Sequence, residues 1–182
     1  MTDWLKRDGG LDAEEFEESC VKMTTVAHSA GLLMYRQRGA QPEVLLVHPG
    51  GPYWSKKDDG SWSIPKGLCD PDEDPLTAAK REFEEETGCR PIGDFFALGE
   101  FKQPGGKIIS AWGFEGDFDL TCFRSNLFTL EWPPGSGRRN EFPEADRAGW
   151  FVPTVGAQKL VKGQVQILNA LLGVLREAHR GP

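Results

Sequence analysis

The chain has 182 residues, 38% of them hydrophobic, which is enough for one domain with a proper core and makes a second independent domain unexpected. Its net charge of −7 disfavours broad electrostatic binding to nucleic acid. Four cysteines without metal-type or disulfide-scaffold spacing, and no signal peptide or long apolar run, lead us to expect a cytoplasmic protein that does not span a membrane.

The N-terminal segment 1–22 is acidic and weakly patterned, so it predicts either a short helix at LDAEEFEES or an extension, and we assign 23–182 to a single domain. Apolar runs predict strands at 25–37 and 43–48. A loop rich in Gly and Pro, HPGGPYWSKKDDGSW, comes next, and a short strand at 62–64 leads into Pro-Lys-Gly.

The segment 67–89 reads GLCDPDEDPLTAAKREFEEETGC and predicts a helix with clear ends. Asp74 suits the N-cap, Pro75 suits the first helical position, and Gly88 suits the C-terminal stop. Three residues on one side form an apolar stripe for the core, namely Leu76, Ala79 and Phe83.

Three carboxylates share one turn of this helix. At about 100° per residue, Glu86 lies about 40° to one side of Glu82 and Glu85 about 60° to the other. The small Ala78 falls between them one turn earlier, which predicts room for a ligand. Carboxylates this close repel one another unless a cation lies between them, and hard oxygen ligands indicate Mg²⁺ or Mn²⁺. The alternative is an ordinary solvated acidic face.

Beyond this helix the sequence predicts paired strands at 92–102 and 107–115 joined by a PGG turn, and further strands at 127–132 and 149–152. The segment 133–148 predicts a polar, Pro-rich loop. Closing helices are predicted at 155–162 and 164–178. This order predicts an α/β fold, a mixed sheet with helices on both faces.

The spacing of the acidic segment has a wider pattern: Gly67, five residues, Glu73, seven residues, then REFEEETGC from Arg81. It resembles the Nudix box of the Nudix hydrolase family at every fixed position, with Cys89 as the loosest match. A chance match is on the order of 10⁻⁸ per start position. The resemblance implies a Nudix-type α/β/α sandwich, in which the box forms a loop–helix–loop motif beside the sheet.

Roles for the box residues follow from this resemblance. It implies metal ligation by the side chains of Glu82, Glu85 and Glu86 and by the backbone carbonyl of Gly67. It also implies that Arg81 pairs with Glu73 and orients the first ligand, although the pair alone would also fit a surface ion pair worth under about 1 kcal/mol. Members of the family differ in which carboxylate accepts the proton from the attacking water, and we select Glu85.

A carboxylate outside the box often completes the site in this family. The candidates are Glu115, Glu141 and Glu144, and the last two lie in the predicted loop before Trp150. We favour Glu141 as this additional metal ligand. The alternative for each is a residue that only keeps the loop soluble.

Substrate contacts are predicted just before the box. Lys66, in the PKG segment, places a cation where an additional phosphate could bind. Tyr53 and Trp54 follow a Gly-Gly-Pro segment and could stack on a nucleobase, whereas Trp62 is expected in the core. The tyrosine that follows the box in many dinucleoside tetraphosphate hydrolases has no counterpart in this chain.

The resemblance therefore implies a Mg²⁺- or Mn²⁺-dependent pyrophosphohydrolase that cleaves a phosphoanhydride bond in nucleoside or dinucleoside polyphosphates. Inositol pyrophosphates and RNA 5′ ends are alternative substrates, and a nucleotide-sensing domain without catalysis is a third reading. The expected partner is a small molecule, without a membrane or extended nucleic acid. The family often forms homodimers, but the sequence identifies no interface.

Overall fold

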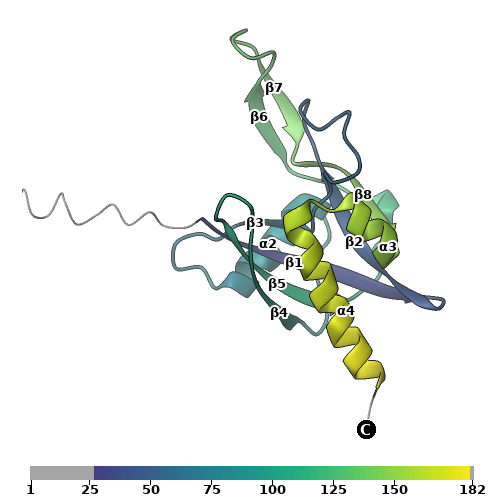
Figure 1. The fold of residues 1–182 in the computed structure, drawn as a ribbon. Coiled ribbons are helices and arrows are strands. Elements are labelled where there is room, and N and C mark those ends of the chain that lie inside the picture. Colours follow the sequence, from purple (N-terminus) through teal and green to yellow (C-terminus); the bar gives the residue numbers. More distant parts are fainter. Residues whose placement is uncertain (1–26, 181–182) are drawn as a thin grey trace, which may run out of the picture.

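The computed structural model describes residues 27–180, and it confirms the predicted mixed sheet with helices on its faces (Figure 1). The strands lie in the order β4 (Phe96–Lys102), β5 (Ile108–Glu115), β1 (His28–Arg38), β2 (Gln41–Pro49) and β8 (Ala145–Phe151), and β3 (Lys66–Leu68) also pairs with β1. β1 and β5 run parallel, whereas the other neighbours are antiparallel. The prediction for 1–22 falls outside the described residues.

Helices cover both faces of the sheet. Along β1, Leu33 and Tyr35 face a core cluster shared with α4 (Val165–His179), whereas Leu32 and Met34 face a cluster shared with α2 (Pro75–Thr87). Successive side chains of a strand point to opposite faces, so one apolar run supplies both cores. α3 (Pro153–Lys159) and α4 confirm the two predicted closing helices.

The sheet opens between β1 and β2, and this opening positions the site. β2 pairs with the second half of β1, up to Arg38, while β3 pairs with the first half, from Ser29. The inserted segment passes very close to β1, because a Cβ at Gly31 would lie 2.9 Å from the carbonyl oxygen of Pro65. Glycine at position 31 therefore allows the residues before the acidic helix to enter the sheet.

The sequence predictions fail at two places in the described chain. The predicted strand at 62–64 forms only isolated bridges to neighbouring segments. The predicted loop at 133–148 contains β7 (Arg139–Pro143) and the start of β8. β7 pairs with β6 (Leu127–Glu131), which confirms the strand predicted at 127–132. Since the β7 sequence RNEFP lacks apolar alternation, no strand was expected there.

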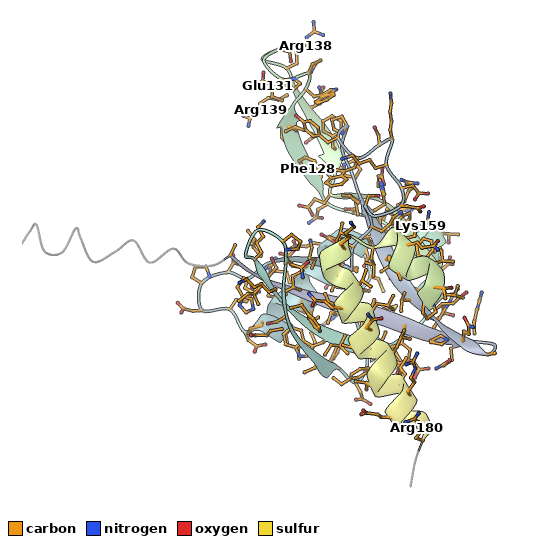
Figure 2. All side chains as sticks on the ribbon, in the orientation of Figure 1. Phe128, Glu131, Arg138, Arg139, Lys159 and Arg180 are labelled. Atoms are coloured by element: carbon orange, nitrogen blue, oxygen red, sulfur yellow. The ribbon has the colours of Figure 1, made fainter. Side chains whose placement is uncertain are left out.

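β6 and β7 form a separate two-stranded sheet that projects away from the main sheet (Figure 1). Phe128 and Phe142 face each other across the pair, with ring centroids 6.1 Å apart. Phe128 lies nearer the base of this hairpin and Arg138 lies at its tip (Figure 2). Among residues 27–180, none of the helices has both the length and the apolar character needed to cross a membrane.

Candidate active site

α2 begins and ends at the predicted residues. The Asp74 carboxylate accepts a hydrogen bond of 2.9 Å from the Thr77 amide, and Pro75 is the first helical residue. Gly88 ends the helix in the left-handed region, with φ of 73°, and its N–H donates to the Glu84 carbonyl. These local interactions fix the register of the helix, and with it the directions in which the carboxylates point.

The face of α2 opposite the solvent packs on β1 and β5. Ala79 and Phe83 are fully buried, as expected for the predicted apolar stripe, and Phe83 meets Phe114 edge to face at 5.4 Å. Ala78 is also fully buried in this core, so the expectation that it leaves room for a ligand is wrong. The stripe extends further toward the carboxylates than predicted because β1 packs beneath Ala78 as well.

Gly67 and Glu82 are packed directly against each other. A Cβ at position 67 would overlap the Glu82 carboxylate, so only glycine leaves the space that this carboxylate occupies. Glu82 is thereby placed beside the β3 backbone, at the opening of the sheet. This close packing fits the resemblance, which implies that Gly67 and Glu82 are ligands of the same metal.

Arg81 connects three carboxylates. Its Nε and Nη2 donate to the two oxygens of Glu73 at 3.1 and 3.0 Å, which confirms the predicted pair. Its Nη1 donates to Glu82 at 2.8 Å and lies 3.5 Å from Glu85, while Nη2 also reaches the Leu68 carbonyl at 3.1 Å. The hydrogen bonds from Arg81 lower the pKa of Glu73. Arg81 therefore holds the Glu82 side chain in one orientation.

The carboxylates beside β3 have raised pKa values. Desolvation raises the pKa of Glu82, and the negative charges of Glu85 and Glu144 raise it further, against the lowering effect of Arg81. Desolvation likewise raises the pKa of Glu86 to about 7, although the Lys66 charge and a 3.3 Å hydrogen bond from the Lys66 amide oppose this shift. Several negative charges thus share one poorly solvated region, which a bound cation would stabilise.

These carboxylates face an open cleft of about 460 Å³. It is lined by Pro49, Gly50, Trp54, Lys66, Gly67, Leu68, Glu82, Glu86, Phe128 and Glu144. The structure therefore brings Glu144, and not the favoured Glu141, to the cleft. Glu141 is exposed on β7, opposite Thr129, because the unexpected strand carries it onto the projecting hairpin. Glu115 lies at the end of β5 and is not among the lining residues.

Of the other predicted residues, some line the cleft and some do not. Lys66 and Trp54 line it, and the Lys57 ammonium lies 4.5 Å from the centre of the Trp54 ring. Tyr53 is 56% exposed and packs edge to face on Trp132 of the hairpin instead. Trp62 is buried in the core, as predicted.

The sequence reasoning missed part of the wall that faces the carboxylates. Phe128 comes from the hairpin, and its ring packs on Gly51 at the start of the 49–60 loop. Gly50 packs on the Pro143 carbonyl and donates its N–H to the Glu144 carbonyl at 2.9 Å. The Gly50-Gly51 pair was the available signal, since glycine allows another segment to approach the backbone closely. The sequence does not show which segment approaches it.

The cleft has the chemistry of a site for a hard divalent cation. Within residues 27–180, no three His, Cys, Asp or Glu side chains are already arranged as a set of metal ligands. The negative charge of Glu144 nevertheless raises the pKa of both Glu82 and Glu86, and all three side chains line the same cleft beside Gly67. Carboxylate and carbonyl oxygens are the ligands that Mg²⁺ and Mn²⁺ prefer, so these residues fit such an ion.

Comparison with known families and curated proteins gives two findings. The family model described as the NUDIX domain matches residues 26–171. An RNA pyrophosphohydrolase of Bartonella henselae is 31% identical over 81 residues, which are 41% of this chain and 44% of that protein. The chain thus spans less than half the length of this curated relative.

Solved structures of similar fold extend over most of the chain. An Ap4A hydrolase binary complex of C. elegans has a TM-score of 0.58 and 21% identity, and covers 84% of this chain and 99% of that chain. The NUDIX domain of Shewanella oneidensis NrtR, complexed with ADP ribose, has a TM-score of 0.60 and 13% identity, and the match covers 91% of this chain and 99% of that chain. At these identities the likeness establishes the fold alone.

Proposed function

The chain belongs to the NUDIX family, and from that premise we propose that it is a divalent-metal-dependent pyrophosphohydrolase acting on nucleoside or dinucleoside polyphosphates. The observation that carries this proposal is the cleft in which Glu82, Glu86 and Glu144 lie beside Gly67 and Lys66. A cluster of carboxylates alone would repel a phosphate group. A cation held by these carboxylates, together with the nearby lysine, would instead attract the phosphate group.

The metal is proposed to be Mg²⁺ or Mn²⁺, held by Glu82, Glu86 and the Gly67 carbonyl. Glu85 is proposed as the third box ligand, although it is not among the residues that line the cleft. We propose Glu144 as the ligand from outside the box, in place of Glu141, because it lines the cleft. When bound, the ion would neutralise the pyrophosphate and lower the pKa of a water molecule.

The protein's own residues have distinct roles in this proposal. Arg81 orients Glu82 through its 2.8 Å hydrogen bond and is itself held by Glu73. Lys66 would neutralise an additional phosphate. Glu85, which lies next to Arg81 at the solvent side of the cluster, would accept the proton of the attacking water. A Glu85→Gln protein as active as the wild type would refute this last assignment.

The wall opposite the carboxylates would hold the organic part of the substrate. Trp54 and Phe128 line the cleft across from Glu82 and Glu86, and an aromatic ring stacked on a nucleobase contributes about 1–3 kcal/mol. Tyr53, also predicted to bind substrate, is a weaker candidate because it packs on Trp132. This pairing of a phosphate end with an aromatic end supports a nucleotide.

Similar proteins support the same class of substrate. The matched structures include an Ap4A hydrolase and a domain complexed with ADP ribose. The curated relative favours a second candidate, hydrolysis of a phosphoanhydride bond at RNA 5′ ends, since it is an RNA pyrophosphohydrolase. A 5′ end requires little protein surface, so the net charge of −7 does not exclude it.

One assay distinguishes these functions. The protein is incubated with nucleoside triphosphates, dinucleoside polyphosphates and 5′-triphosphate RNA, with Mg²⁺, Mn²⁺ or a chelator, and the products are separated and identified. We expect metal-dependent cleavage within the phosphate chain, with nucleotides preferred over RNA. Full activity in the chelator would refute the metal role, and saturable nucleotide binding without any product would favour a sensor. A Glu84→Gln variant serves as a control, because Glu84 is exposed on the other side of α2.

A further inference from the structure

A fully buried histidine, His48, directly precedes Pro49, which lines the cleft. His48, near the end of β2, has no exposed surface, and its ring packs edge to face on Trp62 at 5.3 Å. Its Nδ1 lies 2.7 Å from the Asp146 carboxylate, and its Nε2 lies 2.9 Å from the carbonyl oxygen of Lys57. A buried polar ring in a strand is unusual, and both of its nitrogens are satisfied.

The chemistry of these partners assigns the direction of one hydrogen bond. A backbone carbonyl can only accept, so Nε2–H of His48 donates to Lys57. Asp146, on β8, holds the other nitrogen and thereby sets the plane of the ring. Arg147 contacts the same Asp146 oxygen at 3.4 Å. The sheet therefore presents a rigidly oriented donor to the 49–60 loop.

The bonded carbonyl belongs to the turn that carries Trp54. The Lys57 amide donates to the Trp54 carbonyl at 2.8 Å, and the Trp54 amide donates to the Gly51 carbonyl at 3.3 Å. The Lys57 ammonium also lies over the Trp54 ring. Because Trp54 and Lys57 are joined by this closed turn, holding the Lys57 carbonyl also holds the Trp54 side chain at the cleft.

The two ends of the loop are fixed by polar contacts, and in its middle Tyr53 packs on Trp132 of the hairpin. At the start, the Gly50 amide donates to Glu144, and at the end Lys159 pairs with Asp58 and Asp59 at 2.7 Å (Lys159 is labelled in Figure 2). Within residues 27–180, the hydrogen bond from His48 is the only one that joins residues 51–57 to the rest of the protein.

We propose that His48 is a positioning residue for substrate recognition: by holding the Lys57 carbonyl, it fixes Trp54 against the planar end of a nucleotide in the cleft. This inference rests on the proposed function, since it requires that substrate occupies the cleft beside Trp54. His48 itself does not line the cleft and touches no reacting atom in this account.

Two substitutions separate the two hydrogen bonds of the ring. In His48→Gln, the longer side chain can still place an N–H near the Lys57 carbonyl, although it loses the contact with Asp146. In His48→Asn, the shorter side chain can still contact Asp146 but cannot reach Lys57. We expect His48→Asn to raise KM for the best nucleotide by up to about 150-fold, the upper limit for loss of one stacked base, with kcat within about 3-fold. His48→Gln should keep KM within about 3-fold of the wild-type value.

A second readout does not depend on activity. Lys56 and Lys57 are exposed sites for trypsin in the loop, and Lys107 in the β4–β5 turn provides an internal reference. Limited proteolysis followed by mass spectrometry should show faster cleavage after Lys56 and Lys57, relative to Lys107, in His48→Asn than in wild type or His48→Gln. Loss of global stability alone would accelerate cleavage at all three sites.

Equal KM values and equal relative cleavage in the two variants would overturn the proposal. If either variant does not fold, Asp146→Asn replaces it, because this partly exposed side chain only orients the ring. It should raise KM and loop cleavage to a smaller extent, and wild-type behaviour of Asp146→Asn would then overturn the proposal. A wild-type protein without hydrolase activity would instead contradict the proposed function, and the proteolysis result would still test the hydrogen bond.

Discussion

The two walls of the cleft are built in different ways. The acidic wall comes from one stretch of 21 residues, 66–86, which begins with Lys66 and in which a capped helix, a close-packed glycine and the Arg81 network place the carboxylates. The facing wall combines Pro49, Gly50 and Trp54 with Phe128 and Glu144, which are about 80 residues further along the chain. The first wall is specified by local interactions and the second by tertiary contacts.

This difference suggests a division of labour. The acidic wall carries the groups expected to bind metal and phosphate, which any phosphoanhydride substrate would need. The facing wall carries aromatic side chains on a loop and a projecting hairpin, and these would distinguish one organic group from another. Substitutions in the acidic wall should therefore affect catalysis with every substrate, whereas those of the aromatic side chains in the facing wall should affect the choice of substrate.

The largest effect is expected in the acidic wall. Glu82→Gln should reduce kcat/KM at least about 100-fold for every substrate, because even the hydrogen-bond partners of metal ligands commonly contribute 10- to 100-fold. Titration calorimetry should show weaker Mn²⁺ binding, and the unfolding transition should be retained. Glu84→Gln provides the matched control on the same helix and should behave as wild type. Equal activity of the two variants would contradict the assignment of this wall.

A second pair of variants tests how far the metal site extends into the facing wall. Glu144→Gln should reduce activity and Mn²⁺ affinity about 10- to 100-fold, since Glu144 lies in the cleft with Glu82. Glu141→Gln should change both less than about 2-fold, because an exposed carboxylate on the hairpin makes no contact with the cleft. The reverse order would restore Glu141 as the ligand from outside the box.

Trp54→Ala tests the recognition role of the facing wall. Loss of one stacked ring should raise KM for nucleotides by about 5- to 150-fold, and much less for a phosphoanhydride without a base, such as inorganic tripolyphosphate. Tyr53→Ala, in the same loop, should have a smaller effect because Tyr53 packs on Trp132. Steady-state kinetics measures KM for a nucleotide and for tripolyphosphate in each variant. An equal rise in KM for the two substrates would contradict the distinction between the walls.

The smallest effect concerns the stability of the metal-free protein. Burial raises the pKa of Glu86 from 4.5 to about 7, so folding favours the protonated side chain. The contribution of this group to the free energy of unfolding is therefore fully present below pH 4.5 and is lost as the pH rises through 7. Thermal unfolding in a chelator should therefore show wild type losing more stability than Glu86→Gln between these pH values. Parallel pH profiles would indicate that the acidic wall is better solvated than its geometry implies.

Sequence patterns predicted the acidic wall in detail. The ends of α2, the pairing of Arg81 with Glu73 and the proximity of Gly67 to Glu82 are all present. The helix ends were predictable because caps act over a few residues, whereas the other two features were implied by the resemblance to the Nudix box. Ala78 was misplaced because its burial depends on β1, a strand some 45 residues away in the sequence.

The facing wall was predicted only in part. Trp54 was selected from its position after two glycines, but the choice between Glu141 and Glu144 depended on an unexpected strand, β7. The position of Phe128 at the cleft depends on the way the hairpin packs on the 49–60 loop. Neither feature has a short-range signal in the sequence.

The amino-acid sequence by itself determined the family, the mixed sheet with its helices, and a box helix that presents three glutamates on one turn. The tertiary structure alone decided which distant residues face those glutamates, that Glu144 joins them, and that a buried His48 holds the loop carrying Trp54. The physical reason is range: helix caps and charge pairs are set within one or two turns, whereas a cleft wall forms only when the sheet brings separate segments together.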